Sequence, residues 1–153
     1  MKLSDVIDIS HVKNDIEIHS KKRALEELSK LIAEDQPQLN ASNIFDSLIA
    51  RERLGSTGLG HGIAIPHCRI KNCNKTTGAF IKLESGIDFD AIDNEPVDMM
   101  FALAVPEESS DEHLQILAML ASMFKDENVR QKLRQAETVT ELYHILTEQH
   151  SSE

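Results

Sequence analysis

The sequence predicts an α/β domain in which a sheet is sandwiched between helices. Short strand-like segments alternate along the chain with longer segments whose apolar residues recur at helical spacing. The segment MMFALAV, Met99 to Val105, is apolar throughout, which is typical of a central strand covered on both faces. The chain has 153 residues, of which 41% are hydrophobic, so one domain with a substantial core is expected.

The first helix is predicted in the segment KKRALEELSKLIAE, residues 21–34. Ser20 has a residue type preferred at an N-cap, and Pro37 lies beyond the end. Ahead of this helix, Ile16-Glu17-Ile18 alternates like a short strand. The apolar residues at helical spacing are Ala24, Leu25, Leu28, Leu31 and Ile32.

A second helix is predicted from about Ser42 to Leu54, and Gly55 is expected to form its left-handed C-terminal cap. The next predicted strand is Ile63-Ala64-Ile65, which Pro66 ends because proline cannot donate to a sheet ladder. The apolar face of the helix comprises Ile44, Phe45, Leu48 and Ile49.

The second half of the chain contains two more strand signals, at Gly78 to Leu83 and at Met99 to Val105, where Pro106 follows. A helix is predicted to open at Ser110-Asp111-Glu112-His113, and further helices around 128–134 and 140–146. The expected buried stripe of the helix after Ser110 is Leu114, Leu117, Ala118, Ala121 and Phe124. No linker divides the chain, so residues 1–150 are assigned to a single domain and 151–153 to a short tail.

Composition excludes several classes of function. The net charge of −10, with 26 acidic against 16 basic residues, argues against a general nucleic-acid binder. No segment reaches 18 apolar residues and the N-terminus has no signal-peptide core, so the protein is not expected to be membrane-embedded. Cys68 and Cys73 form no disulfide framework, which favours the cytoplasm. His11, His19, His144 and His150 are expected at the surface.

Four of the six glycines lie in GSTGLGHGIAIPH, Gly55 to His67. Such a loop can cradle phosphate with backbone N–H groups. It nevertheless lacks the Lys-Ser/Thr pair of the Walker loop and the third glycine of the dinucleotide fingerprint. Binding of a nucleotide or small anion without covalent chemistry therefore remains an alternative. The candidate phosphate-loop residues are Gly55, Ser56, Thr57, Gly58, Gly60 and Gly62.

His67 is the candidate nucleophile. It follows a proline at the end of a predicted strand, and an imidazole with a pKa near 6.5 is about three quarters neutral at pH 7. The free nitrogen could accept a phosphoryl group, whose transfer requires mainly positioning and charge stabilisation. His113 would lie in the first turn of a helix if Ser110 caps it, and Arg51 could supply a fixed positive charge.

Neither a metal nor a cofactor is expected. His61, His67, Cys68 and Cys73 form the cluster with ligand chemistry, but their spacing matches no zinc pattern with two well-separated ligand pairs. Met99, Met100, Met119 and Met123 lie in apolar runs and are expected to fill the core.

The segment RERLGSTGLGHGIAIPH, Arg51 to His67, resembles the enzyme IIA domains of the bacterial phosphoenolpyruvate-dependent phosphotransferase system, in the fructose/mannitol/nitrogen-regulatory class. The similarity continues through FDAIDNEPVDMMFALAVPEE, HLQILAMLASMF and SKKRALEELSKLIA, and so covers nearly the whole chain. It implies an α/β sandwich with a mixed sheet, in which His67 takes a phosphoryl group from an HPr-type carrier. His113 would assist, with Arg51 nearby.

The resemblance is closest to the nitrogen-regulatory members, and the chain carries no IIB, IIC or HPr-like segment. This implies a standalone regulator, phosphorylated by an HPr/NPr-type phosphocarrier, that binds targets such as a potassium transporter or sensor kinase. A sugar-transport IIA that passes phosphate to a IIB domain is the close alternative. The sequence departs from the family at His61, where asparagine is usual, and at Cys68, where glycine is usual.

Overall fold

The structure is a computed structural model that describes residues 2–108 and 111–148. Its centre is a six-stranded sheet in the order β1-β5-β6-β3-β2, with β4 also pairing with β6. The β5–β6 and β2–β3 pairs are antiparallel and the others are parallel, so the sheet is mixed. The strands are β1 (Val12–Ile16), β2 (Gly58–Gly60), β3 (Ile63–Ala64), β4 (His67–Ile70), β5 (Thr77–Ile87) and β6 (Val97–Pro106).

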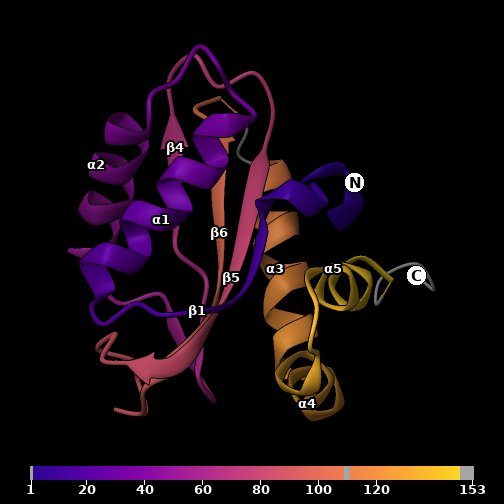
Figure 1. Cartoon of the computed structure of the whole chain (residues 1–153). Helices are drawn as coiled ribbons and strands as arrows, with labels where there is room; N and C mark the ends of the chain where they lie inside the picture. The colour runs from indigo at the N-terminus through magenta and orange to yellow at the C-terminus, as the bar shows by residue number, and fades with distance from the viewer. Residues whose placement is uncertain (1, 109–110, 149–153) are drawn as a thin grey trace.

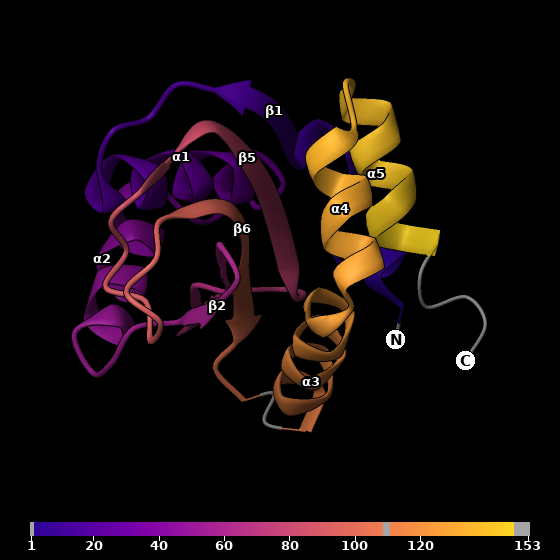
Figure 2. The ribbon, with the colours of Figure 1, turned by 90° about the horizontal axis from the view of Figure 1, so that it is seen from below.

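Helices cover both faces of this sheet. Figure 1 shows α1 and α2 on one face and α3, α4 and α5 on the other, and Figure 2 shows the same layers from below. The helices are α1 (Lys21–Glu34), α2 (Ala41–Glu52), α3 (Asp111–Lys125), α4 (Glu127–Gln135) and α5 (Val139–Glu148), with 3-10 turns at Leu3–Asp5 and Ile9–His11. The predicted α/β sandwich is confirmed. No helix among the described residues is both long and apolar enough to cross a membrane.

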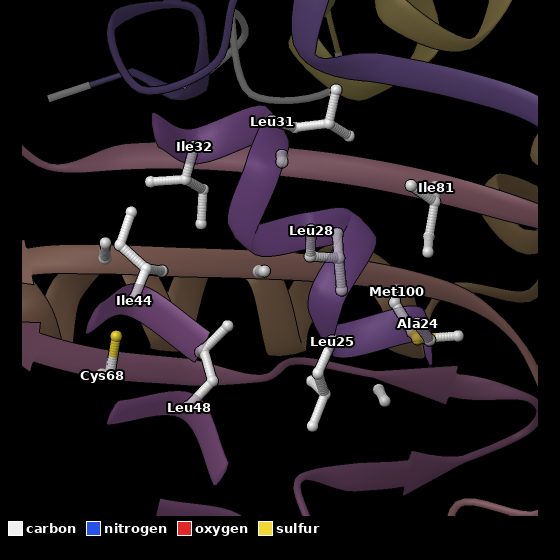
Figure 3. Packing of buried hydrophobic residues seen from close by; sticks show 14 of the residues in the cluster. Ala24, Leu25, Leu28, Leu31, Ile32, Ile44, Leu48, Cys68, Ile81 and Met100 are labelled. Carbon is white, nitrogen blue, oxygen red and sulfur yellow. The ribbon is translucent and has the colours of Figure 1, made fainter. Parts of the chain in front are cut away.

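The first half of the core lies between α1, α2 and the sheet (Figure 3). Ser20 caps α1 as predicted, because its hydroxyl accepts a hydrogen bond from the Arg23 N–H at 3.2 Å. The predicted apolar face of α1 is fully buried, and in Figure 3 Ala24 lies beside Met100 of the sheet. In α1 the residues that recur at helical spacing are therefore the same residues that pack against the sheet.

The second half of the core lies between the sheet and α3 to α5. The rings of Phe80, Phe101 and Phe124 meet with centroids 6.3 to 6.5 Å apart. The stripe predicted for α3 is wrong at Leu114, which is 62% exposed, and at Ala118, which is also exposed, whereas Phe124 is buried and Leu117 and Ala121 are half-buried. Among the α3 residues whose burial is described, the buried ones are His113, Ile116, Leu120, Met123 and Phe124. Both sets recur at helical spacing, so spacing could not choose between them.

Two element boundaries also differ from the prediction. The helix α2 begins after Asn40, whose side chain caps it, and ends at Glu52. Arg53, in a right-handed conformation, is the C-terminal cap, so Gly55 does not have the predicted role. The strand β1 spans Val12–Ile16 instead of 16–18, because its pairing with β5 runs from Val12 opposite Phe80 to Ile16 opposite Leu83.

His11 is predicted at the surface but is 2% exposed. Its Nδ1 lies 3.3 Å from the carbonyl oxygen of Gly78, so its imidazole is a partnered core group. His19 and His144 are exposed as predicted. The predicted cap Ser110, His150 and the tail 151–153 lie outside the described residues.

Candidate functional site

A cavity of about 430 Å³ lies between α2, β4 and the start of α3. It brings together His67, His113 and Arg51, which the sequence singles out from three separate segments. Arg69 also lines it, and sequence reasoning missed this residue. The remaining lining residues are Ser47, Ala50, Leu54 and Cys68.

His67 is held at the first position of β4, paired with Leu103 of the central strand. Its Nδ1 lies 2.8 Å from the carbonyl oxygen of Ile65. A carbonyl can only accept, so Nδ1 carries the hydrogen and donates it. In the neutral ring the lone pair is then on Nε2, the nitrogen that is free to react. Pro66 fixes the backbone between Ile65 and His67, which helps to hold the ring in this orientation.

Burial lowers the pKa of His67 below the usual 6.5. The hydrogen bond to Ile65 acts in the opposite direction, Arg51 lowers the pKa further and Glu52 raises it. The net effect is a lowered pKa, which keeps the imidazole neutral at a pH where an ordinary histidine would be partly charged.

We expect the ring of His67 to titrate below pH 6.5 in the folded protein, as measured by NMR of its carbon-bound protons, and near 6.5 after unfolding in urea. The unfolded chain then binds this proton more tightly. Stability must therefore fall as the pH falls from about 6.5 through the folded pKa. A His67→Gln variant should lose less stability over the same window. A folded midpoint at or above 6.5 would contradict the assignment.

His113 lies in the first turn of α3 and is 7% exposed. Its ring centroid is 5.3 Å from that of His67, with the two planes tilted by 55°. Burial lowers the pKa of His113, and the charges of His67, Arg69 and Arg51 add to this. Its Nδ1 is buried and has no hydrogen-bond partner within the described residues. Such a group costs about 1–3 kcal/mol, and a bound polar ligand could supply the missing partner.

Arg51 and Arg69 give the cavity two guanidinium groups. Arg51 is in the last turn of α2, and its Nη1 donates to the carbonyl oxygen of Gly55 at 2.8 Å. Arg69 follows His67 by two residues on β4, so strand alternation places both on the same face. This alternation could have identified Arg69, had β4 been predicted after Pro66.

The cavity is positively charged within an acidic chain. Among the described residues that line it, the ionisable side chains apart from the Cys68 thiol are the two arginines and two histidines, with no carboxylate. The net charge of the whole chain is −10. The arrangement suits an anion that approaches a neutral imidazole nitrogen.

Cys68 borders the cavity, but strand alternation places its side chain on the opposite face of β4 from the ring of His67. It alternates with His67 on β4, is 6% exposed, and packs in the core near Ile44 and Leu48 (Figure 3). Burial, with a smaller effect of Cys73, raises the pKa of the Cys68 thiol to about 12. The thiol is therefore protonated at neutral pH and is no competing nucleophile.

The glycine loop does not line the cavity with His67. The Ser56 hydroxyl donates to the carbonyl of Phe89 at 3.0 Å, and the Thr57 hydroxyl and N–H group bond to the Glu52 carboxylate. Gly62 has φ +81°, which favours glycine, and its carbonyl accepts from Asp98 and Met99. The residues expected to hold phosphate, which this structure places outside the cavity, are Gly55, Ser56, Thr57, Gly58, Gly60 and Gly62.

The loop instead directs the chain from α2 to β4. A Cβ atom on Gly58 would lie 2.8 Å from the Cβ of Ala91, so glycine permits the close packing of two loops. His61 has φ +59°, a left-handed conformation in which asparagine is common, and its N–H donates to Asp93 at 3.0 Å. Within residues 2–108 and 111–148, no group of three or more His, Cys, Asp or Glu could hold a metal ion.

Residues 5–149 match the family described as phosphoenolpyruvate-dependent sugar phosphotransferase system, EIIA 2. The chain is 47% identical over 129 residues to a nitrogen regulatory protein of Pseudomonas aeruginosa, which covers 84% of each sequence. It is 41% identical to the crystallised nitrogen regulatory protein IIA-Ntr of Neisseria meningitidis. That structure superposes with a TM-score of 0.90 over 95% of this chain and 99% of the other.

A more distant likeness concerns the fold alone. IIA-Mtl of Escherichia coli, solved in complex with phosphorylated IIB-Mtl, matches with a TM-score of 0.75 at 19% identity. The match covers 94% of this chain and 100% of the other. The mixed sheet between two helical layers is therefore shared between nitrogen-regulatory and mannitol-type IIA proteins.

Proposed function

The chain belongs to the EIIA 2 family of the phosphoenolpyruvate-dependent sugar phosphotransferase system, and we propose that it carries a phosphoryl group on Nε2 of His67. The observation that carries this proposal is the hydrogen bond from His67 Nδ1 to the Ile65 carbonyl. That bond leaves Nε2 unprotonated in a cavity whose charged groups are basic.

The phosphoryl donor is an HPr/NPr-type phosphocarrier bearing a phosphohistidine. The lone pair of His67 Nε2 attacks phosphorus, and the phosphorus–nitrogen bond to the carrier breaks. The electron pair of that bond returns to the carrier's imidazole, which leaves neutral. Each ring keeps the hydrogen on its other nitrogen, so no proton is exchanged. The hydrogen bond to Ile65 compensates the positive charge that develops on the His67 ring.

His113 and Arg51 stabilise the transferred group. Arg51 is oriented by its bond to Gly55 and supplies positive charge toward the phosphoryl oxygens. A ring N–H of His113, 5.3 Å from His67 between ring centroids, donates to one of those oxygens.

Replacing His113 with alanine should slow phosphoryl transfer about 10²-fold, in the range typical of losing one transition-state donor. His113→Gln keeps an N–H donor and should recover part of the rate. Single-turnover transfer, followed by intact mass, measures both. A His113→Ala rate equal to the wild-type rate would remove His113 from the site.

The proposed role is regulatory, in the cytoplasm. The similarity to nitrogen regulatory proteins supports binding to targets, such as a potassium transporter or sensor kinase, that depends on the phosphorylation state. A sugar-transport IIA is the second candidate, because the fold is shared with IIA-Mtl. Transfer of the phosphoryl group from His67 to a fructose- or mannitol-type IIB domain would favour that candidate.

The direct test uses phosphoenolpyruvate, enzyme I and an HPr/NPr-type carrier. One phosphoryl group should appear on the chain by intact mass, be lost in acid, and map to His67. The alternative of non-covalent nucleotide or anion binding requires saturable binding of ATP or phosphate without any phosphodonor protein. If that binding occurs and no phosphoryl group is gained, the proposed function is wrong.

A further inference from the structure

We propose that Arg69 is a second guanidinium that binds the phosphoryl oxygens on His67. This inference rests on the proposed function and adds a residue to its site. The role proposed for Arg69 is in the phosphorylation of His67 itself. It can therefore be tested without the docking of a protein partner.

Arg69 is in position to reach that group. His67 and Arg69 are at alternate positions of β4, whose residues have the register His67 opposite Leu103 and Arg69 opposite Val105. Residues two apart on a strand lie roughly 6.5 Å apart on the same face, within the span of an arginine side chain. Arg69 is exposed and lines the cavity with His67 and His113. The fold thus places Arg69 and His67 on the same face of β4 and in the lining of one cavity.

The N–H groups of Arg69 are available. Other arginines are bound: Arg51 to the Gly55 carbonyl, and Arg134 to Asp98. The Arg69 guanidinium makes no hydrogen bond or ion pair with any residue in the described part of the chain. Asp46 and Glu107 line an adjacent cavity that Arg69 also borders. Neither carboxylate forms an ion pair with the Arg69 guanidinium, because no nitrogen–oxygen distance between them is 4 Å or less. A guanidinium has five N–H donors, and none of those of Arg69 is bonded to a residue within 2–108 or 111–148.

The electrostatic influence of Arg69 already extends into the site. Its charge contributes to the lowered pKa of His113, after burial and His67. A phosphoryl group carries oxygens that a planar guanidinium can bind in pairs, whereas a lysine offers only a compact point charge. Arg51 and Arg69, from α2 and β4, would therefore bind the group from two elements.

The test uses phosphoramidate as the phosphodonor, so that no carrier protein has to dock. His67 Nε2 attacks its phosphorus, the phosphorus–nitrogen bond breaks and ammonia leaves. Wild type, Arg69→Gln, Arg69→Lys and the control Lys71→Gln are compared by intact mass, with ³¹P NMR to identify phosphohistidine. Lys71 is exposed and lies outside the His67 cavity, so its substitution removes the same charge nearby.

Arg69→Gln should slow phosphorylation about 10- to 100-fold with an unchanged melting temperature, and Arg69→Lys should recover part of the rate. Lys71→Gln should remain within about twofold of wild type, because Lys71 lies outside the cavity and solvent and salt screen its exposed charge. Equal rates for Arg69→Gln and Lys71→Gln would overturn the role of Arg69 and leave the proposed function intact. Failure of the wild type to gain phosphate on His67 from both phosphoramidate and the carrier would overturn both.

Discussion

Replacing His67 with alanine is expected to abolish phosphoryl acceptance, with at least a 10³-fold loss of rate in single-turnover assays, because a covalent carrier has no activity without its nucleophile. The neighbouring nucleophilic side chains, Cys68 and His113, are both buried. Burial raises the pKa of the Cys68 thiol to about 12, so it stays protonated. His113 is 7% exposed, so a phosphodonor reaches its ring less readily than the half-buried ring of His67. The measurement is intact mass after incubation with phosphorylated carrier.

Two further variants test whether the loss in His67→Ala comes from removing the nucleophile and not from altered packing. His67→Gln preserves polarity and approximate size, so equal loss in this variant excludes a packing effect. His19→Ala removes an exposed histidine outside the cavity and should be phosphorylated at the wild-type rate. A phosphoryl group that persists in both His67 variants would identify another acceptor and refute the proposed role of Nε2.

The difference between predicted and observed helices has a physical basis. The α1 face was predictable because the other side of KKRALEELSKLIAE is strongly charged, so one packing satisfies the segment. In α3 most residues are apolar, and two sets of positions have helical spacing. Packing against the sheet selects the set that includes Ile116 and Leu120, and Leu114 remains exposed. Such a choice depends on contacts that are distant in sequence.

The residues of the site could be predicted where the residues next to them in the sequence indicate their role. His67 could be identified from its neighbours, and its proximity to His113 and Arg51 followed from the family resemblance. Arg69 was missed because a proline such as Pro66 normally ends a strand. In the structure a new strand, His67–Ile70, begins directly after that proline and pairs with β6. Unaided sequence reasoning also proposed the glycine loop as a phosphate cradle. In the structure the loop lies outside the His67 cavity, and its Ser56 and Thr57 donors bond to Phe89 and Glu52.

The second large effect concerns stability and a buried lysine. Lys82 lies in β5, is 5% exposed, and its Nζ donates to the carbonyl oxygens of Leu133, Arg134 and Ala136 at 2.8 to 3.2 Å. These carbonyls belong to the C-terminal end of α4, where a helix has acceptors without intrahelical donors and a partial negative charge. The ammonium therefore joins α4 to the sheet and caps the helix.

Lys82→Met should lower the free energy of unfolding by about 3 kcal/mol, and the melting temperature by roughly 10 °C, in calorimetry or denaturant unfolding. Methionine matches the lysine in length and relieves the burial of a charge, which offsets part of the loss. It leaves the carbonyls without donors, however, and the cost of these unsatisfied buried acceptors exceeds that relief. Because Lys82 lies outside the His67 cavity, phosphoryl transfer by the folded variant should be unchanged.

Lys13→Met is the matched control. Lys13 lies in the neighbouring strand β1, opposite Ile81, but its side chain is exposed and makes no hydrogen bond to the described residues. Its replacement should change stability by no more than about 0.5 kcal/mol, as is usual at such surfaces. If both variants lose the same small amount, the bonds to α4 contribute little, and hydrophobic packing alone holds the C-terminal helices on the sheet. A selective loss in Lys82→Met would instead identify the ammonium as the polar link between the two.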